Sequence, residues 1–167
     1  MVTLQAIVKP ALVKTVTICC ERGLKMSMQE GTEQLNREYI LPYCRLQLYD
    51  AYTVVTVNEG VHIDFAEIEE ISTVLQNHYH DKPFGLIANR INRYSTNPLA
   101  VKQFFSNEHI VAGAIVGSHL TTRLNAEIEM DIIDGAPVAF FTELDQARIW
   151  VKTTVKAATE SLTITPA

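Results

Sequence analysis

The chain has 167 residues, of which 47% are hydrophobic and 20% charged, and its formal net charge is −5 at pH 7. This composition excludes a mainly disordered chain, and seven glycines and six prolines exclude a collagen-like or proline-rich one. A negative charge argues against nucleic-acid binding through bulk attraction. We expect one domain of ordinary size, long enough to bury a core without disulfides or structural metals.

The charge is unevenly distributed along the chain. Residues 1–27 hold four basic side chains and one acidic side chain, whereas the remaining 140 residues hold ten basic and eighteen acidic ones. The first part therefore has a net charge of +3 and the rest a net charge of −8. We interpret residues 1–27 as a basic leader, 28–42 as an N-terminal extension, 43–157 as the folded domain and 158–167 as a tail.

The leader has apolar stretches that are interrupted by lysine and proline. Its longest apolar run, Thr15 to Cys20, is too short for a transmembrane segment, which takes roughly 20 residues. A secretory signal is a poor fit because the lysines lie inside the apolar part. Three readings stay open: a transit peptide, upstream sequence before a natural start at Met26 or Met28, or an extra element packed on the domain.

The cysteines indicate a reducing compartment. The chain has three, Cys19, Cys20 and Cys44. Adjacent cysteines rarely form a disulfide with each other, and an odd number without C-x-x-C spacing is typical of neither a disulfide framework nor a zinc site. We expect reduced thiols in the cytoplasm, no bound metal and no cofactor.

The first elements of the domain form a hairpin and a helix. Residues 45–49 alternate polar and apolar side chains, residues 52–57 are β-branched or aromatic, and Asp50 and Ala51 lie between them. This pattern predicts an antiparallel hairpin. Asp64 and Glu67 have the spacing of a capping box, which predicts a helix start at Asp64. Its apolar face repeats at helical spacing: Phe65, Ile68, Ile71, Leu75 and Tyr79.

Three strand–helix units follow in the second half of the domain. Residues 84–88, 110–116 and 137–141 are short apolar runs typical of buried strands. Each is followed by a helical pattern, and alternating strands and helices predict a mostly parallel sheet. The expected fold is α/β: a single sheet of four or five strands with an N-terminal antiparallel hairpin and about four helices.

The helix expected after the second of these strands has an apolar repeat and a candidate N-cap. Its apolar positions repeat every four residues, at Leu120, Leu124, Ile128 and Ile132, and we expect this face to be buried. Ser118 is expected to cap its start. The acidic side chains at Glu127, Glu129 and Asp131 lie at two-residue steps, which do not share a helix face, and are interpreted as solvated surface.

Residues 137–151, Pro-Val-Ala-Phe-Phe-Thr-Glu-Leu-Asp-Gln-Ala-Arg-Ile-Trp-Val, resemble the C-terminal signature of STAS/SpoIIAA-like domains. The order of elements from about residue 43 to 155 is also similar to that family, which includes bacterial anti-sigma-factor antagonists and is related to CRAL-TRIO folds. The resemblance implies regulatory binding rather than turnover, with a protein partner or a second copy of the chain. The family's Asp-x-Ser-Gly loop is missing here, so phosphorylation is reduced to a possibility at Ser95 or Thr96.

Ligands of open α/β sheets bind at the carboxyl ends of the strands. The side chains expected at that edge, as candidates for binding a ligand or partner, are Asn89, Arg90, Arg93, Tyr94, Ser118 and His119. Arg90 and Arg93 lie near the start of a helix that Asn97 and Pro98 predict, where a phosphate or carboxylate could bind. The alternative is a solvated polar loop.

Two other groups of residues are weaker candidates. His78, His80 and Asp81 have a spacing that a metal could use, but on a helix the two histidines point about 200° apart, and favourable placement at the helix C-terminus is the simpler reading. His119 or Glu59 could act as an acid or base, yet no nucleophile motif accompanies either.

Three functional hypotheses remain. The first is a non-enzymatic regulatory module of STAS/SpoIIAA-like type that binds a partner through residues 89–97 and 117–119. The second is a carrier of a small molecule or lipid, with a pocket at the carboxyl edge of the strands and an arginine on an acidic head group. The third, an enzyme, has the least support.

Overall fold

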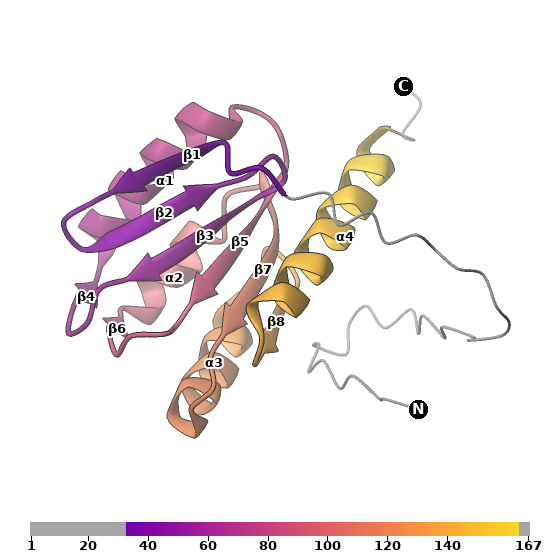
Figure 1. Ribbon diagram of the computed structural model, residues 1–167. Coiled ribbons are helices and arrows are strands. Elements are labelled where there is room, and N and C mark those ends of the chain that lie inside the picture. The colour runs from indigo at the N-terminus through magenta and orange to yellow at the C-terminus, as the bar shows by residue number, and fades with distance from the viewer. Residues whose placement is uncertain (1–32, 164–167) are drawn as a thin grey trace, which may run out of the picture.

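The computed structural model describes residues 33–163, in which a six-stranded sheet lies between helices (Figure 1). The sheet order is β1-β2-β3-β5-β7-β8. Its strands are β1 (Arg37–Ile40), β2 (Cys44–Leu48), β3 (Tyr52–Val57), β5 (Phe84–Asn89), β7 (Ile110–Val116) and β8 (Val138–Phe141). A second, two-stranded parallel sheet pairs β4 (His62–Ile63) with β6 (Ser95–Thr96). The helices are α1 (Phe65–Tyr79), α2 (Pro98–Phe104), α3 (Leu120–Ile132) and α4 (Leu144–Thr163).

The strand pairing confirms the expected fold class. β1, β2 and β3 pair antiparallel, and every neighbour from β3 to β8 pairs parallel. The main sheet has six strands rather than four or five, because Arg37–Ile40 adds an edge strand next to β2. These four residues have only one half-buried side chain, so their hydrophobic pattern carries little strand signal.

The boundaries differ from those expected at both ends of the domain. The extension at 28–42 contributes β1 to the main sheet, and α4 continues to Thr163, where the sequence indicated a tail from residue 158. The leader at 1–27, including Cys19, Cys20 and the alternative starts at Met26 and Met28, lies outside the described residues.

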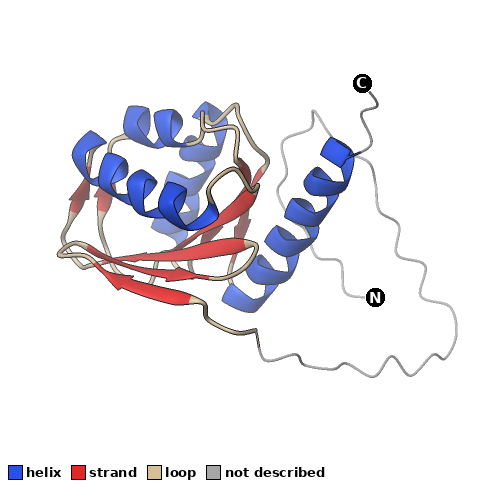
Figure 2. Ribbon diagram, turned by 90° about the horizontal axis from the view of Figure 1, so that it is seen from above, coloured by secondary structure: helices blue, strands red, loops and turns tan. Residues whose placement is uncertain are grey.

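The two faces of the main sheet are covered differently (Figure 2). Helices α1, α2 and α3 pack on one face, and α4 packs on the other, over β5, β7 and β8. Alternate residues of each strand therefore enter two separate cores. On strand β3, Val54 belongs to the core under α4, whereas Val55 belongs to the core under the three helices.

The core under α4 is built from small side chains. Ala112, Ala139 and Ala147 are fully buried there. Gly85 has no room for a side chain, because a Cβ atom at that position would overlap a methyl group of Val151 on α4. The backbones of the sheet and this helix consequently approach each other closely.

The start of α1 confirms the predicted capping box. The Asp64 carboxylate accepts a hydrogen bond from the Phe65 N–H, and the Glu67 carboxylate accepts one from the Asp64 N–H at 2.9 Å. The helix buries Ile71, Leu75 and Tyr79 as expected. The predicted cap of α3 is wrong: His119, not Ser118, occupies the cap position, and its side chain makes no capping bond.

Candidate functional site

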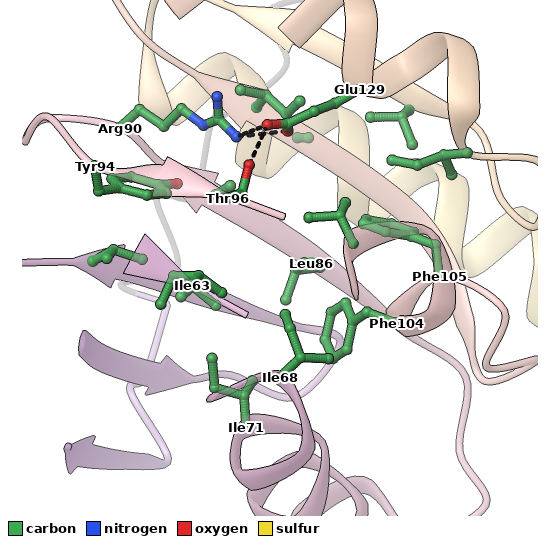
Figure 3. A pocket seen from close by; sticks show the side chains of 18 residues that line it. Ile63, Ile68, Ile71, Leu86, Arg90, Tyr94, Thr96, Phe104, Phe105 and Glu129 are labelled. Atoms are coloured by element: carbon green, nitrogen blue, oxygen red, sulfur yellow. Dashed lines mark hydrogen bonds and ion pairs between the residues drawn. The ribbon is translucent and has the colours of Figure 1, made fainter. Parts of the chain in front are cut away.

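A cavity of about 80 Å³ lies between the main sheet and the helices α1, α2 and α3 (Figure 3). A buried water needs roughly 10–15 Å³ in this measure, so the space is large for a protein interior. The walls are almost entirely apolar and come from the strands β3, β4, β5, β7 and β8, from the helices α1 and α2, and from the residue that ends α2. They include Ile63, Ile68, Ile71, Leu86, Phe104 and Phe105.

One end of the cavity is polar. Arg90 follows the last residue of β5, Thr96 lies in β6 and Glu129 lies on α3, so three separate elements meet there (Figure 3). Nη2 of Arg90 donates to both carboxylate oxygens of Glu129, at 2.7 and 2.6 Å. The hydroxyl of Thr96 donates to Oε1 of Glu129 at 2.8 Å. The ring of Tyr94 lies 5.2 Å from the guanidinium carbon of Arg90.

This ion pair is buried. The side chains of Arg90 and Glu129 are 10% and 9% exposed. Burial alone lowers the pKa of Arg90, but the neighbouring Tyr94 and Glu129 outweigh it and raise that pKa above its ordinary value. Burial is also the main reason why the pKa of Tyr94 is raised. Arg90 therefore stays positive and Tyr94 stays neutral at pH 7.

One buried donor of Arg90 has no hydrogen-bond partner. Its Nε is buried and has no hydrogen-bond partner among residues 33–163. Unpaired polar groups of this kind are rare in protein interiors, because a buried donor without an acceptor loses the hydrogen bond it had with water.

The loop after β5 is held in place by the loop after β3. The N–H of Arg93 donates to the carboxylate of Glu59 at 2.6 Å, and the Asn92 amide donates to the carbonyl of Val57 at 2.8 Å. The N–H of Gly60 donates to the carbonyl of Arg93 at 2.7 Å. These hydrogen bonds fix the loop, which presents Arg90 and Tyr94 to the cavity.

The structure brings some of the predicted site residues together and leaves others apart. Arg90, Tyr94 and Thr96 line the cavity. The remaining predicted binding residues do not line it: Asn89 is half-buried, and Arg93, Ser118 and His119 are exposed. Arg90, which the sequence offered together with Arg93 as a partner for a phosphate or carboxylate, is paired with Glu129.

The two predicted phosphorylation positions differ in access. Ser95 is exposed, and its Oγ lies 2.7 Å from Nδ1 of His62 on the neighbouring strand β4. Thr96 is half-buried and its hydroxyl is bound to Glu129. Phosphorylation at either position remains a prediction, and only Ser95 is readily accessible to a kinase.

Glu129 is the site residue that the sequence analysis missed. It was interpreted as solvated surface, and this is wrong, because the side chain is buried. The error came from the face chosen for α3. Leu120, Leu124 and Ile128 were expected inside but are 72%, 51% and 60% exposed, whereas Ala126, Glu129 and Met130 face the core. Ala126, Met130 and Ile133 do recur at helical spacing, and this was the available signal.

The weaker candidates are not gathered at the cavity. Glu59 and His119 are exposed and lie outside its lining. His78 is in the last turn of α1 and His80 is its C-cap residue. Within residues 33–163, no three His, Cys, Asp or Glu side chains are grouped so as to hold a metal ion. Burial raises the pKa of the free Cys44 thiol to about 12, so it stays protonated.

Comparisons with known proteins bear on the fold. No family model matches the chain, and no curated protein matches it. The chain is similar to the solved structure of an uncharacterized protein from the DUF3478 family, with a SpoIIAA-like fold, from Shewanella loihica PV-4. The TM-score is 0.47 and the sequence identity 12%, over 71% of this chain and 98% of that one. None of the helices in the described part of the chain is long and apolar enough to cross a membrane.

Proposed function

We propose that the protein is a non-enzymatic binding domain of STAS type that holds a small, mainly apolar molecule in the cavity under α1, α2 and α3. The observation that carries the proposal is the cavity itself, with apolar walls and one preformed polar cluster. Ligand pockets commonly combine a largely apolar lining with a few fixed polar groups. This is the carrier hypothesis, which the sequence analysis kept as its second reading.

Two arguments favour a binding site over a packing defect. An apolar cavity of about 80 Å³ costs a fold at most about 2 kcal/mol when nothing fills it, since its lining loses packing contacts. The chain also buries a charged pair at the end of this cavity, although apolar side chains of similar size are often at least as stabilising. A ligand that contacts both the walls and the polar end accounts for both features.

The polar cluster is better suited to binding than to catalysis. The Thr96 hydroxyl contacts a carboxylate, which is the arrangement of a nucleophile and a base. Arg90, however, donates to both oxygens of that carboxylate, which are therefore already engaged as acceptors. The two acid–base candidates from the sequence, Glu59 and His119, do not line the cavity. We therefore propose binding without turnover, in the cytoplasm that the cysteine pattern predicts.

Methyl NMR tests the proposal directly. Protein labelled at isoleucine methyl groups is titrated with benzene at pH 7, and we expect shifts at Ile63, Ile68 and Ile71, which line the cavity. Ile87 is fully buried in the core under α4 and is the internal control, which stays unshifted. Shifts spread equally over both cores, or none at all, would contradict the proposal.

A cavity-filling variant provides the matched control. Ala88 lines the cavity, on the same side of β5 as Leu86, so Ala88→Leu places three more carbons in the empty space. We expect the variant to fold with unchanged or greater stability and to lose the benzene-induced shifts. Undiminished binding in a folded Ala88→Leu variant would place the ligand elsewhere.

The exposed face of α3 favours a second candidate function, self-association. Leu120, Leu124 and Ile128 form an exposed apolar stripe, and Arg123 and Glu127 lie along one side of it with a 3.2 Å ion pair between them. When α3 of one copy packs antiparallel to α3 of a second copy, the two chains run in opposite directions along the contact. Arg123 of one copy then faces Glu127 of the other. A second copy of the chain therefore fits both the stripe and its charges.

The oligomeric state tests this second candidate. We expect light scattering after size-exclusion chromatography to report a dimer, and Leu124→Glu to convert it to a monomer. Leu99→Glu is the matched control, because Leu99 is also exposed, at 66% against 51% for Leu124, but lies on α2. A monomer at every concentration, or a dimer that Leu124→Glu leaves intact, contradicts it.

A further inference from the structure

We infer that the ligand of this cavity is an uncharged molecule with a hydrogen-bond acceptor, such as an alcohol, ketone or ester with a short apolar body. The inference rests on the proposed function and narrows it. It also departs from the sequence-based expectation of an anionic ligand on Arg90 or Arg93.

The charged side chains that line the cavity balance each other. Of the side chains that line it, only Arg90 and Glu129 are charged, and they have opposite signs. They are joined by two hydrogen bonds of 2.7 and 2.6 Å, so the cluster is neutral as a unit. A carboxylate, phosphate or ammonium ligand would therefore bring an uncompensated charge into an apolar space, which is strongly unfavourable.

A negatively charged ligand could pair with Arg90 only if it displaced Glu129, and this displacement is unfavourable. A ligand carboxylate would gain Arg90 as its partner only by removing Glu129 from it. Glu129 would then lose both hydrogen bonds from Arg90 while remaining buried on α3. The hydroxyl of Thr96, which also donates to Glu129, would remain as a partner of the displaced carboxylate. Exchange of one buried carboxylate for another thus leaves an unpaired negative charge, whereas a neutral ligand leaves the pair intact.

The cluster of Arg90, Glu129 and Thr96 leaves one buried donor of Arg90 unused. Nε of Arg90 is buried and unpaired among the described residues, and the adjacent Tyr94 ring lies 5.2 Å from the guanidinium carbon. An oxygen that accepts from this N–H satisfies it without altering the charge balance. The apolar remainder of the ligand then faces the side chains of α1, α2 and the sheet (Figure 3).

The experiment uses three probes of equal chain length on the unmodified full chain: 1-hexanol, hexanoate and hexylammonium at pH 7. Dissociation constants are measured from the shifts of the cavity isoleucine methyls, with Ile87 as the reference. We expect 1-hexanol to bind at least roughly tenfold more tightly than either charged probe, since only the charged probes leave a buried charge unpaired. This comparison needs no variant and so does not depend on how a mutation affects folding.

The outcomes separate the inference from the proposed function. Hexanoate binding as tightly as 1-hexanol, or more tightly, overturns the inference and leaves the apolar site in place. Hexylammonium binding best overturns it in the same way. Benzene and all three probes failing to shift the cavity methyls overturns the proposed function and, with it, the inference.

A double variant tests the role of the polar cluster. Arg90→Met with Glu129→Leu replaces both partners by apolar side chains of similar size, an exchange that buried ion pairs often tolerate. We expect benzene to bind as before and 1-hexanol to lose roughly tenfold in affinity, because the donor is gone. Unchanged affinity for 1-hexanol in the folded double variant would contradict the assignment of Arg90 as the donor.

Discussion

The two faces of the main sheet are packed in opposite ways although the same strands supply both. Under α4, glycine and alanine allow the helix backbone to lie close to the sheet, and Gly85 has no space for a methyl group. Under the other three helices, larger side chains such as Leu86 and Phe104 hold the helices further away and leave the cavity. The α4 face is therefore closely packed, whereas the face under α1, α2 and α3 encloses a cavity.

The buried charges show the same contrast. The described residues bury Arg90 and Glu129 on the three-helix face, at the cavity. The core under α4 contains aromatic and aliphatic side chains. The charged side chain beside it, Arg148, is 28% exposed and pairs with the exposed Asp145, although its Nε is also buried without a partner. A fold selected only for packing has no need of a charged pair at one end of an unfilled space.

The largest effect is expected from breaking the buried pair on one side. Glu129→Ala leaves Arg90 buried without its partner, and we expect the free energy of unfolding to fall by about 3–5 kcal/mol. The double variant Arg90→Met with Glu129→Leu is the control and should stay near the wild-type value. Urea denaturation followed by circular dichroism measures both. A loss below about 1 kcal/mol in Glu129→Ala would show that the pair is better solvated than its burial indicates.

A methyl group added to each face tests how tightly the two faces are packed. In Gly85→Ala, the new methyl meets Val151, a stiff side chain on α4, and we expect a loss of about 1–3 kcal/mol. In Gly113→Ala, the methyl comes within 2.7 Å of Cε1 of Phe105, whose ring borders the cavity and has space to move. We expect the smaller loss at Gly113. Equal losses in thermal unfolding would contradict the difference between the faces.

Neighbouring valines on β3 offer a finer comparison of the same kind. Val54→Ile adds a methylene to the core under α4, and we expect it to destabilise the fold by about 1 kcal/mol. Val55→Ile adds the same group to the lining of the cavity, where it should be neutral or stabilise by up to about 0.8 kcal/mol. The two substitutions are chemically identical, so urea denaturation of the pair isolates the packing of each face.

The smallest expected effect concerns acid stability at the edge of the three-helix face. The hydrogen bond from the Phe65 N–H, together with one from the Asn97 amide, lowers the pKa of Asp64 in the folded state. A carboxyl group whose pKa is lower when folded stabilises the fold above its unfolded pKa. That contribution is lost as the pH falls through the folded pKa. Asp64→Asn keeps a good helix cap, so we expect near-wild-type stability at pH 7 and a weaker loss in acid.

The measurement for Asp64 is the urea midpoint as a function of pH. The wild-type curve should fall more steeply than that of Asp64→Asn at pH values below the unfolded pKa of aspartate, about 3.9. Parallel curves would mean that other carboxyl groups account for the acid sensitivity.

Much of the fold was predictable because its signals are local. The strands at 52–57, 84–88 and 110–116 are β-branched or apolar runs of strand length, and the structure contains a strand at each. The capping box at Asp64 and Glu67 depends on residues three positions apart, and it too was correctly placed. The four-residue edge strand β1 lacked such a signal and was missed.

The candidate site depended on contacts between distant segments. Arg90 was correctly singled out from its position after a buried strand, but its partner lies 39 residues further along the chain. Residues on α3 have two alternative apolar faces, and the leucine-rich one was the stronger pattern in the sequence. The helix turns its other face inward, with Ala126, Glu129 and Met130 buried.

Side-chain periodicity and neighbouring residues were enough to predict the α/β class, the parallel pairing of the later strands and the capped start of α1. The buried face of α3, the pairing of Glu129 with Arg90 and the cavity beside them depend on how the helix packs against the rest of the fold. The physical reason is that a buried carboxylate is stable only next to a partner of opposite charge, and the fold alone brings that partner within hydrogen-bonding distance.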